Sequence, residues 1–173
     1  NEPWQRLVDI GGRESAGCYC TADPAMQQYV EQAYAALAAA QPDFMWVDDD
    51  VRLESHGAEV PFACFCGRCL AVFSKQTGRP WTREALKAAF NGGTREARLA
   101  LRQQWLEHNR GYIVDLLQRI RAAVDTVNPA LPIGMMTGET AYSGYGFARY
   151  AEALAGARRV EVNWRPGGGF YAE

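Results

Sequence analysis

The sequence has little net charge, few lysines and no long hydrophobic run. Its formal net charge is −2, and only two of its 18 basic residues are lysines. Bulk electrostatics therefore favour neither nucleic acid nor an anionic membrane as a partner. No apolar run approaches the ~20 residues that a bilayer-spanning helix needs, and no signal peptide is recognised. We expect a cytoplasmic protein, and the start at Asn1 without an initiator Met predicts an excerpt of a longer one.

Cysteine is present in an odd number, five, which argues against a secreted disulfide framework and favours a reducing compartment with a metal. Cys64, Cys66 and Cys69 lie within six residues, here called the knuckle (residues 64–69). Three thiols this close can share one tetrahedral zinc if a fourth ligand joins them, and Cys18 and Cys20 are both candidates. The alternative is a set of buried, reduced cysteines, a common core residue.

The pattern along the 173 residues predicts a single α/β domain after a Gly-rich, irregular segment at residues 1–22. Helical spacing and caps predict five helices, and short apolar runs predict three strands. The expected helices begin at Pro24, at the knuckle (ending at Gly78), at Thr82, at Gly92–Thr94 and at Phe147, the last ending near Leu154. The expected strands are Phe44–Val47, Leu131–Thr137 and Val160–Trp164.

Strands separated by helices predict parallel pairing. Polar residues follow each expected strand, which is typical of the active face of a (β/α)8 barrel. A whole barrel needs ~250 residues, so the sequence predicts a partial TIM-barrel-like α/β fold. We expect one domain over residues 1–173, with a Cys-rich zinc knuckle inserted at about residues 51–78, after the strand that ends in Asp48–Asp50.

Several residues near the strand ends are candidates for binding or catalysis. Asp48–Asp50 follows an apolar strand directly, and glycoside cleavage needs a carboxylic acid opposite a second carboxylate. An acidic loop or a cation site is the alternative for this run. Candidate substrate-binding residues, each of which could instead be a solvated or packing residue, are Arg52, His56, Glu139, Asn163 and Trp164. Trp46 is predicted to pack in the core, and His108 is assigned no role.

A series of motifs follows in a fixed order along the first half of the chain. They are Gly12–Arg13, Tyr19–Cys20, Asp23–Pro24, Trp46–Asp50, His56, Cys64–Cys69 and Phe73. In this order they resemble the family 42 glycoside hydrolases, zinc-containing β-galactosidases with a (β/α)8 catalytic domain. That family has an Arg-rich stretch ending in Tyr-Cys, a strand ending in Asp-Asn-Glu-Tyr, a His and a Cys-x-Cys-x-x-Cys knuckle.

The resemblance implies roles for individual residues. The zinc ligands would be Cys20, Cys64, Cys66 and Cys69. Asp49 corresponds to the family's sugar-contacting Asn, and Asp50 corresponds to its acid/base Glu. Leu131–Met136 resembles the fifth strand of the barrel and Val160–Trp164 the sixth, so the strand with the nucleophile is expected outside this chain.

The resemblance thus predicts a retaining glycoside hydrolase-like protein acting on β-linked carbohydrate, with structural Zn²⁺. The expected partners are a carbohydrate and either further copies of the chain or the remainder of the barrel. Two alternatives stay open. The first is a zinc-knuckle module that binds nucleic acid or protein, although Arg68 is the only basic residue in the knuckle. The second is a barrel that binds carbohydrate without catalysis.

Overall fold

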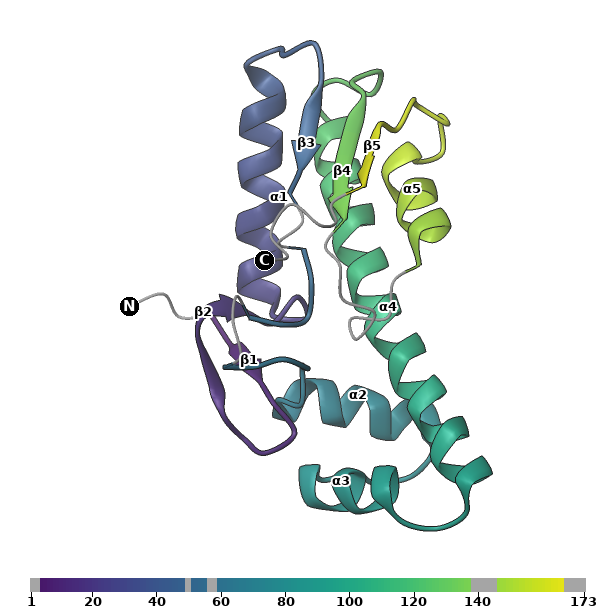
Figure 1. Cartoon of the computed structure of the whole chain (residues 1–173). Helices are drawn as coiled ribbons and strands as arrows, with labels where there is room; N and C mark the ends of the chain where they lie inside the picture. Colours follow the sequence, from purple (N-terminus) through teal and green to yellow (C-terminus); the bar gives the residue numbers. More distant parts are fainter. Residues whose placement is uncertain (1–3, 49–50, 56–58, 138–145, 167–173) are drawn as a thin grey trace, which may run out of the picture. The chain divides into compact units, whose positions relative to one another are not determined.

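The computed structural model describes residues 4–48, 51–55, 59–137 and 146–166 (Figure 1). These residues form two compact units, described separately below. Unit 1 comprises residues 4–23, 53–55 and 59–111, and unit 2 comprises residues 24–48, 51–52, 112–137 and 146–166. The prediction of one domain over residues 1–173 with an insertion at about 51–78 stays a prediction.

Unit 1 begins with an antiparallel hairpin of β1 (Arg6–Val8) and β2 (Glu14–Tyr19). In the turn, the Asp9 carboxylate accepts the backbone N–H groups of Gly11 and Arg13, at 2.7 and 2.8 Å. Gly12 has a φ of 90°, a conformation that a side chain disfavours. The prediction of an irregular segment over residues 1–22 is therefore wrong for this hairpin, because its glycines form a tight turn between two strands.

The helices of unit 1 are α2 (Gly67–Thr77), α3 (Arg83–Asn91) and the first part of α4 (Arg95–Asp125). Gly78 ends α2 in the left-handed conformation, with a φ of 66°. The Thr82 side chain accepts the N–H of Ala85 at 3.1 Å and so caps α3. The predicted helix boundaries at Gly78 and Thr82 are confirmed.

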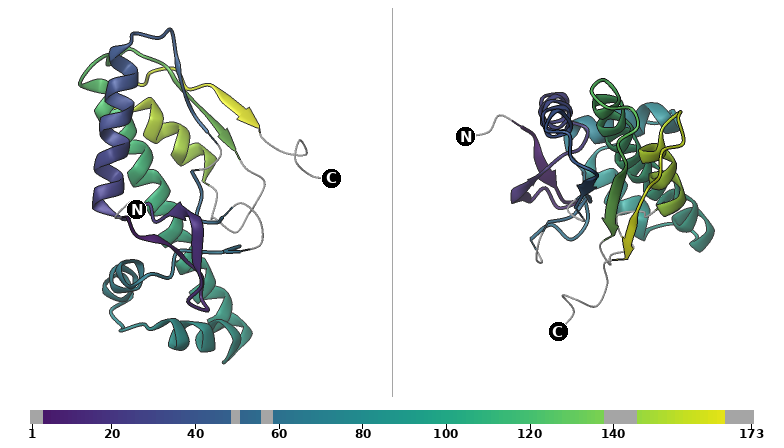
Figure 2. Two further views of the ribbon diagram at one scale, coloured as in Figure 1. Left: turned by 90° about the vertical axis from the view of Figure 1, so that its left-hand side faces the viewer. Right: turned by 90° about the horizontal axis from the view of Figure 1, so that it is seen from above.

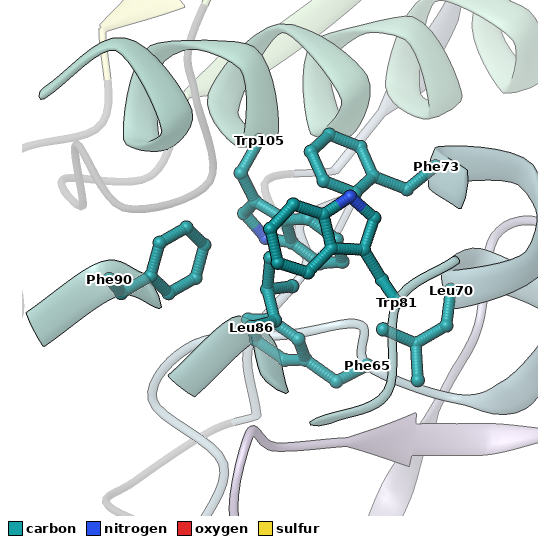
Figure 3. Close-up of a cluster of buried hydrophobic side chains, with 7 residues drawn as sticks. All are labelled: Phe65, Leu70, Phe73, Trp81, Leu86, Phe90 and Trp105. Atoms are coloured by element: carbon teal, nitrogen blue, oxygen red, sulfur yellow. The ribbon is translucent and has the colours of Figure 1, made fainter. Parts of the chain in front are cut away.

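An aromatic core holds these helices together, and Figure 3 shows its seven side chains converging from the knuckle, from α2, α3 and α4, and from the loop between α2 and α3. Trp105 of α4 lies at its centre, in contact with the rings of Phe65, Phe73 and Phe90. The members are Phe65, Leu70, Phe73, Trp81, Leu86, Phe90 and Trp105. Burial of this apolar surface is the main source of stability for unit 1.

Unit 2 contains a parallel three-stranded sheet in the order β3 (Met45–Val47), β4 (Ile133–Thr137) and β5 (Trp164–Pro166). Helices α1 (Pro24–Ala39), the second part of α4 and α5 (Phe147–Ala155) lie along one face of this sheet (Figures 1 and 2). Parallel strands alternate with helices, as predicted. The fold is α/β and resembles part of a TIM barrel.

The sheet places its side chains by strict alternation. Met45 and Val47 are buried, whereas Trp46, between them, is half-buried and lies against Gly134 of β4. The last strand begins at Trp164 and not at Val160 as predicted. The chain first turns at Arg159, whose φ is 56°, before reaching the sheet.

Candidate functional site

Four cysteine sulfurs converge in the interior of unit 1. The Sγ atoms of Cys20, Cys64, Cys66 and Cys69 all lie within 4.8 Å of one another, and each residue is at most 2% exposed. The Cys20 and Cys69 sulfurs are 3.5 Å apart, and the Cys20 and Cys66 sulfurs are 3.9 Å apart. All four cysteines are free of disulfide bonds. The structure thus brings together the four cysteines that the sequence resemblance selects.

Strand β1 aligns the two segments that carry these cysteines. The Cys20 N–H donates to the Gln5 carbonyl, just before β1, at 2.7 Å. The Phe65 N–H, between Cys64 and Cys66, donates to the Val8 carbonyl at the end of β1, also at 2.7 Å. Backbone hydrogen bonds to β1 and to the residue before it therefore position both segments that carry the cysteines.

Helix α2 supplies the other half of the cluster. Cys66 is its N-cap residue, with φ −68° and ψ 163°, and Cys69 lies in its first turn. The Leu70 N–H donates to the Cys66 carbonyl at 3.0 Å and closes that turn. The positive end of the helix dipole favours anionic sulfur at this position.

Cys18, the alternative fourth ligand, lies in β2 outside the cluster. It is half-buried, and its N–H donates to the Ser15 hydroxyl at 3.1 Å. Of the two upstream cysteines, Cys20 is therefore the member of the buried cluster.

The arrangement fits a tetrahedral, sulfur-ligated metal. With zinc–sulfur bonds of ~2.3 Å, tetrahedral geometry separates the sulfurs by about 3.8 Å. The observed distances of 3.5 and 3.9 Å lie on either side of this value. Thiolates are soft ligands that select zinc or iron–sulfur centres over hard cations. Four sulfurs complete the coordination shell and leave no open position for substrate, so such a centre would be structural.

Contacts among the sulfurs shift the pKa values of three of these thiols in different directions. Contacts with Cys64 and Cys66, together with burial, raise the pKa of Cys20. Hydrogen bonding from Cys20, then from Cys64 and Cys69, lowers the pKa of Cys66. Contacts with Cys20, Cys64 and Cys66 raise the pKa of Cys69. Several buried negative charges this close would repel one another, and a divalent cation removes that repulsion.

One turn of α4 packs against the knuckle. The ring of Trp105 stacks on Phe65 with centroids 4.4 Å apart, and His108 lies 5.2 Å from Phe73. His108 is 6% exposed, and its Nδ1–H donates to Gln76 Oε1 at 2.7 Å. Burial lowers the pKa of His108 to about 4, so its ring is neutral at pH 7. The Asn109 amide donates to the Ala63 carbonyl at 3.1 Å.

Asn109 was missed as a site residue from the sequence, whereas His108, which is assigned no role, is a buried residue that packs on Phe73 and Trp105. The available signal is their spacing: they follow Trp105 by three and four residues and so share its face of the helix.

The acidic run begins at the carboxyl end of β3 in unit 2. Asp48 is exposed there, whereas Asp49 and Asp50 lie outside the described residues. Because β3, β4 and β5 are parallel, their carboxyl ends share one edge of the sheet. Burial, and secondarily the negative charge of Asp48, raises the pKa of Tyr34 to about 12. Asp48 is therefore the residue of the acidic run that the structure places at this edge.

The candidate substrate-binding residues are described only in part. Arg52 is half-buried and Asn163 is exposed, whereas His56 and Glu139 lie outside the described residues. Trp164 is half-buried at the start of β5 and meets Phe147 of α5 edge-on, with centroids 5.4 Å apart. Their roles in binding substrate stay predictions.

Comparison with known proteins shows similarity in fold alone. No protein-family model matches the sequence, and no curated protein matches it. A β-galactosidase from Bacillus circulans sp. alkalophilus is similar in structure with a TM-score of 0.55 and 16% sequence identity, over 98% of this chain and 28% of that chain. The catalytic domain of β-amylase from Paenibacillus polymyxa has a TM-score of 0.56 and 11% identity, over 92% of this chain and 51% of that chain.

The chain therefore spans about a quarter to a half of the lengths of these two structures. The comparison shows that the fold of this chain is similar to parts of these two structures. Among the helices of the described residues, none is long and apolar enough to cross a membrane.

Proposed function

We propose that this chain is part of a glycoside hydrolase-like protein that contains a structural zinc centre. The observation that carries the zinc centre is the buried set of four sulfurs, all within 4.8 Å of one another. Cys20, Cys64, Cys66 and Cys69 would hold the Zn²⁺. The bound ion would join β1, the knuckle and α2, so it would contribute to folding and not to the reaction.

The glycosidase proposal rests on the acidic run at the end of a parallel strand, in a fold similar to those of a β-galactosidase and a β-amylase. Asp50 would donate a proton to the leaving glycosidic oxygen, and Asp49 would contact the sugar. A nucleophilic carboxylate outside residues 1–173 would attack the anomeric carbon, and water activated by Asp50 would then release the sugar, as in retaining enzymes. Arg52, His56, Glu139, Asn163 and Trp164 would complete the binding site, in one domain with the knuckle inserted at about residues 51–78.

The aromatic residues of the knuckle argue against the alternative of a nucleic-acid-binding module. Such modules stack bases on exposed aromatic rings. Phe65 is instead fully buried under Trp105, and Phe73 is 1% exposed. The rings of Phe65 in the knuckle and Phe73 in α2 therefore belong to the core of unit 1.

Hydrolysis of alkyl β-glycosides, whose leaving groups are poor, by the intact protein tests the proposal. Turnover that is lost in Asp50→Asn, with zinc content unchanged, would support it. Carbohydrate binding without turnover would identify a non-catalytic barrel, and the absence of both binding and turnover would contradict the proposal.

A further inference from the structure

Asn109 of α4 contacts the backbone immediately before a proposed metal ligand. Its side chain is 1% exposed, and Nδ2 donates to the Ala63 carbonyl at 3.1 Å. Cys64 is the next residue. The orientation of the amide follows from chemistry, because a carbonyl only accepts hydrogen bonds and a flipped amide would bring two acceptors together.

The backbone around Cys64 is held at three successive points. The Ala63 N–H donates to the Leu53 carbonyl at 2.9 Å, and the Phe65 N–H donates to the Val8 carbonyl at 2.7 Å. Asn109 binds the carbonyl that lies between these two groups. The three contacts come from the segment after β3, from β1 and from α4, so together they fix where the Cys64 side chain leaves the backbone.

An asparagine at this position is unfavourable if it only fills space. Among the residues that the structure describes, no hydrogen-bond donor reaches Asn109 Oδ1, although that atom is buried. A buried amide with an unsatisfied oxygen is less stable than an apolar side chain of similar shape. The N–H···O bond to Ala63 is therefore the feature of Asn109 that an apolar residue could not reproduce.

We propose that Asn109 is a positioning residue of the metal centre. Its amide holds the Ala63 carbonyl so that Cys64 Sγ meets the sulfurs of Cys20, Cys66 and Cys69 at tetrahedral spacing. This inference rests on the proposed zinc centre. Hydrogen bonds outside the ligand shell orient metal ligands, and their loss typically lowers metal affinity by about 10–100-fold.

Two variants of the intact protein test this role. Asn109→Leu removes the amide and keeps a similar volume, and it should release zinc to excess chelator at least about tenfold faster than the unmodified protein. Its cobalt-substituted form should show altered visible d–d bands, because the sulfur geometry changes. Asn109→Asp in its ionised form cannot donate to Ala63 and places a carboxylate against the Ala63 carbonyl, so it should release zinc faster still at a pH at which this carboxyl is ionised.

Leu86→Val is the control for packing, because Leu86 belongs to the aromatic core of unit 1 and is not a proposed metal ligand. It should lower the melting temperature but leave the zinc release rate and the cobalt spectrum unchanged. If Asn109→Leu behaves like this control, Asn109 only packs and the inference is overturned. If the unmodified protein binds no zinc, the metal centre itself is wrong, which is a separate outcome.

A measurement on the unmodified protein covers the case in which the Asn109 variants do not fold. The side-chain amide protons of Asn109, observed by nuclear magnetic resonance, should exchange slowly with solvent in the zinc-loaded protein and faster after zinc removal. Equal exchange in a metal-free protein that stays folded would show that Asn109 is not coupled to the metal and would overturn the inference.

Discussion

Phe65 lies flat on Trp105, with ring centroids 4.4 Å apart and planes only 5° from parallel. Phe65 also separates Cys64 from Cys66 in the sequence. The same stack therefore joins the core of unit 1 to the sulfur cluster, and packing and metal binding are expected to support each other.

Replacement of Trp105 tests the packing half of this relationship. Trp105→Ala should lower the free energy of unfolding by about 3–5 kcal/mol, since it leaves a cavity under Phe65, Phe73 and Phe90. Denaturant unfolding of the zinc-loaded protein measures this change. Gln104→Ala, at the exposed neighbouring position on α4, should change stability by less than about 0.5 kcal/mol. A loss below about 1 kcal/mol for Trp105→Ala would contradict the central place of this ring.

In unit 2, Gly134 is a position at which an added side chain should lower stability. A Cβ atom there would meet the Trp46 ring and would lie 3.0 Å from the Asn163 carbonyl oxygen. Gly134→Ala should therefore destabilise the protein by about 1–3 kcal/mol. At Gly111, inside α4, a Cβ meets no atom within 4 Å, so Gly111→Ala should stabilise it by about 0.5–1 kcal/mol. Urea midpoints that shift in the same direction for both variants would contradict this packing.

Ionisation of Tyr34 should lower the free energy of unfolding at alkaline pH. Its hydroxyl donates to the Trp46 carbonyl at 3.4 Å, and burial raises its pKa to about 12. The unfolded tyrosine ionises near pH ~10, so the unfolded state loses protons first as the pH rises. The contribution of Tyr34 to the free energy of unfolding is fully present below about pH 10. It is lost as the pH rises towards 12, by up to about 3 kcal/mol.

Unfolding free energies near pH ~9 and pH ~11.5 measure this loss. Tyr34→Phe should lose less stability over this interval than the unmodified protein. Tyr29→Phe, at a position 55% exposed, should behave like the unmodified protein. Equal losses in all three proteins would show that Tyr34 does not carry the effect.

Much of the fold follows from local signals in the sequence. The caps at Gly78 and Thr82 and the glycines before Arg95 define α2, α3 and the start of α4, because each acts within one helical turn. The β1–β2 hairpin was missed, since its stability depends on the Asp9 turn and on the knuckle packed beside it. Helical spacing of apolar residues in the sequence continues to Val127, but α4 ends at Asp125 and Val127 is 43% exposed.

The candidate site was predictable only where spacing in the sequence carries the chemistry. The knuckle indicates a thiolate site by itself, whereas its spacing leaves both Cys18 and Cys20 as candidates, of which the family resemblance favours Cys20. The hydrogen bonds from Cys20 to Gln5 and from Phe65 to Val8 decide between them, and both join residues distant in sequence. The spacing of Asn109 after Trp105 indicates only a shared face of the helix, because the role of Asn109 depends on a contact with Ala63, 46 residues away.

Asp50→Asn in the intact protein tests the proposed acid. Asn is nearly isosteric with Asp but cannot supply a proton, so turnover of β-glycosides with poor leaving groups should fall by about 10²–10⁴-fold. Substrates with a very acidic leaving group need little protonation, so their first step should be largely spared. A residue that only binds sugar would instead weaken both substrate classes alike. Unchanged turnover of the poor-leaving-group substrates would remove Asp50 from this role and leave Asp49 as the next candidate.

Zinc content and X-ray absorption at the zinc edge test the four-sulfur centre most directly. Protein prepared without chelators should contain about one zinc per chain, with four sulfur neighbours at ~2.3 Å. Cys66→Ser should lose zinc, whereas Cys18→Ser should keep it, because Cys18 lies outside the cluster. Protein without zinc, a metal shell containing nitrogen or oxygen, or full zinc occupancy in Cys66→Ser would contradict a centre formed by Cys20, Cys64, Cys66 and Cys69.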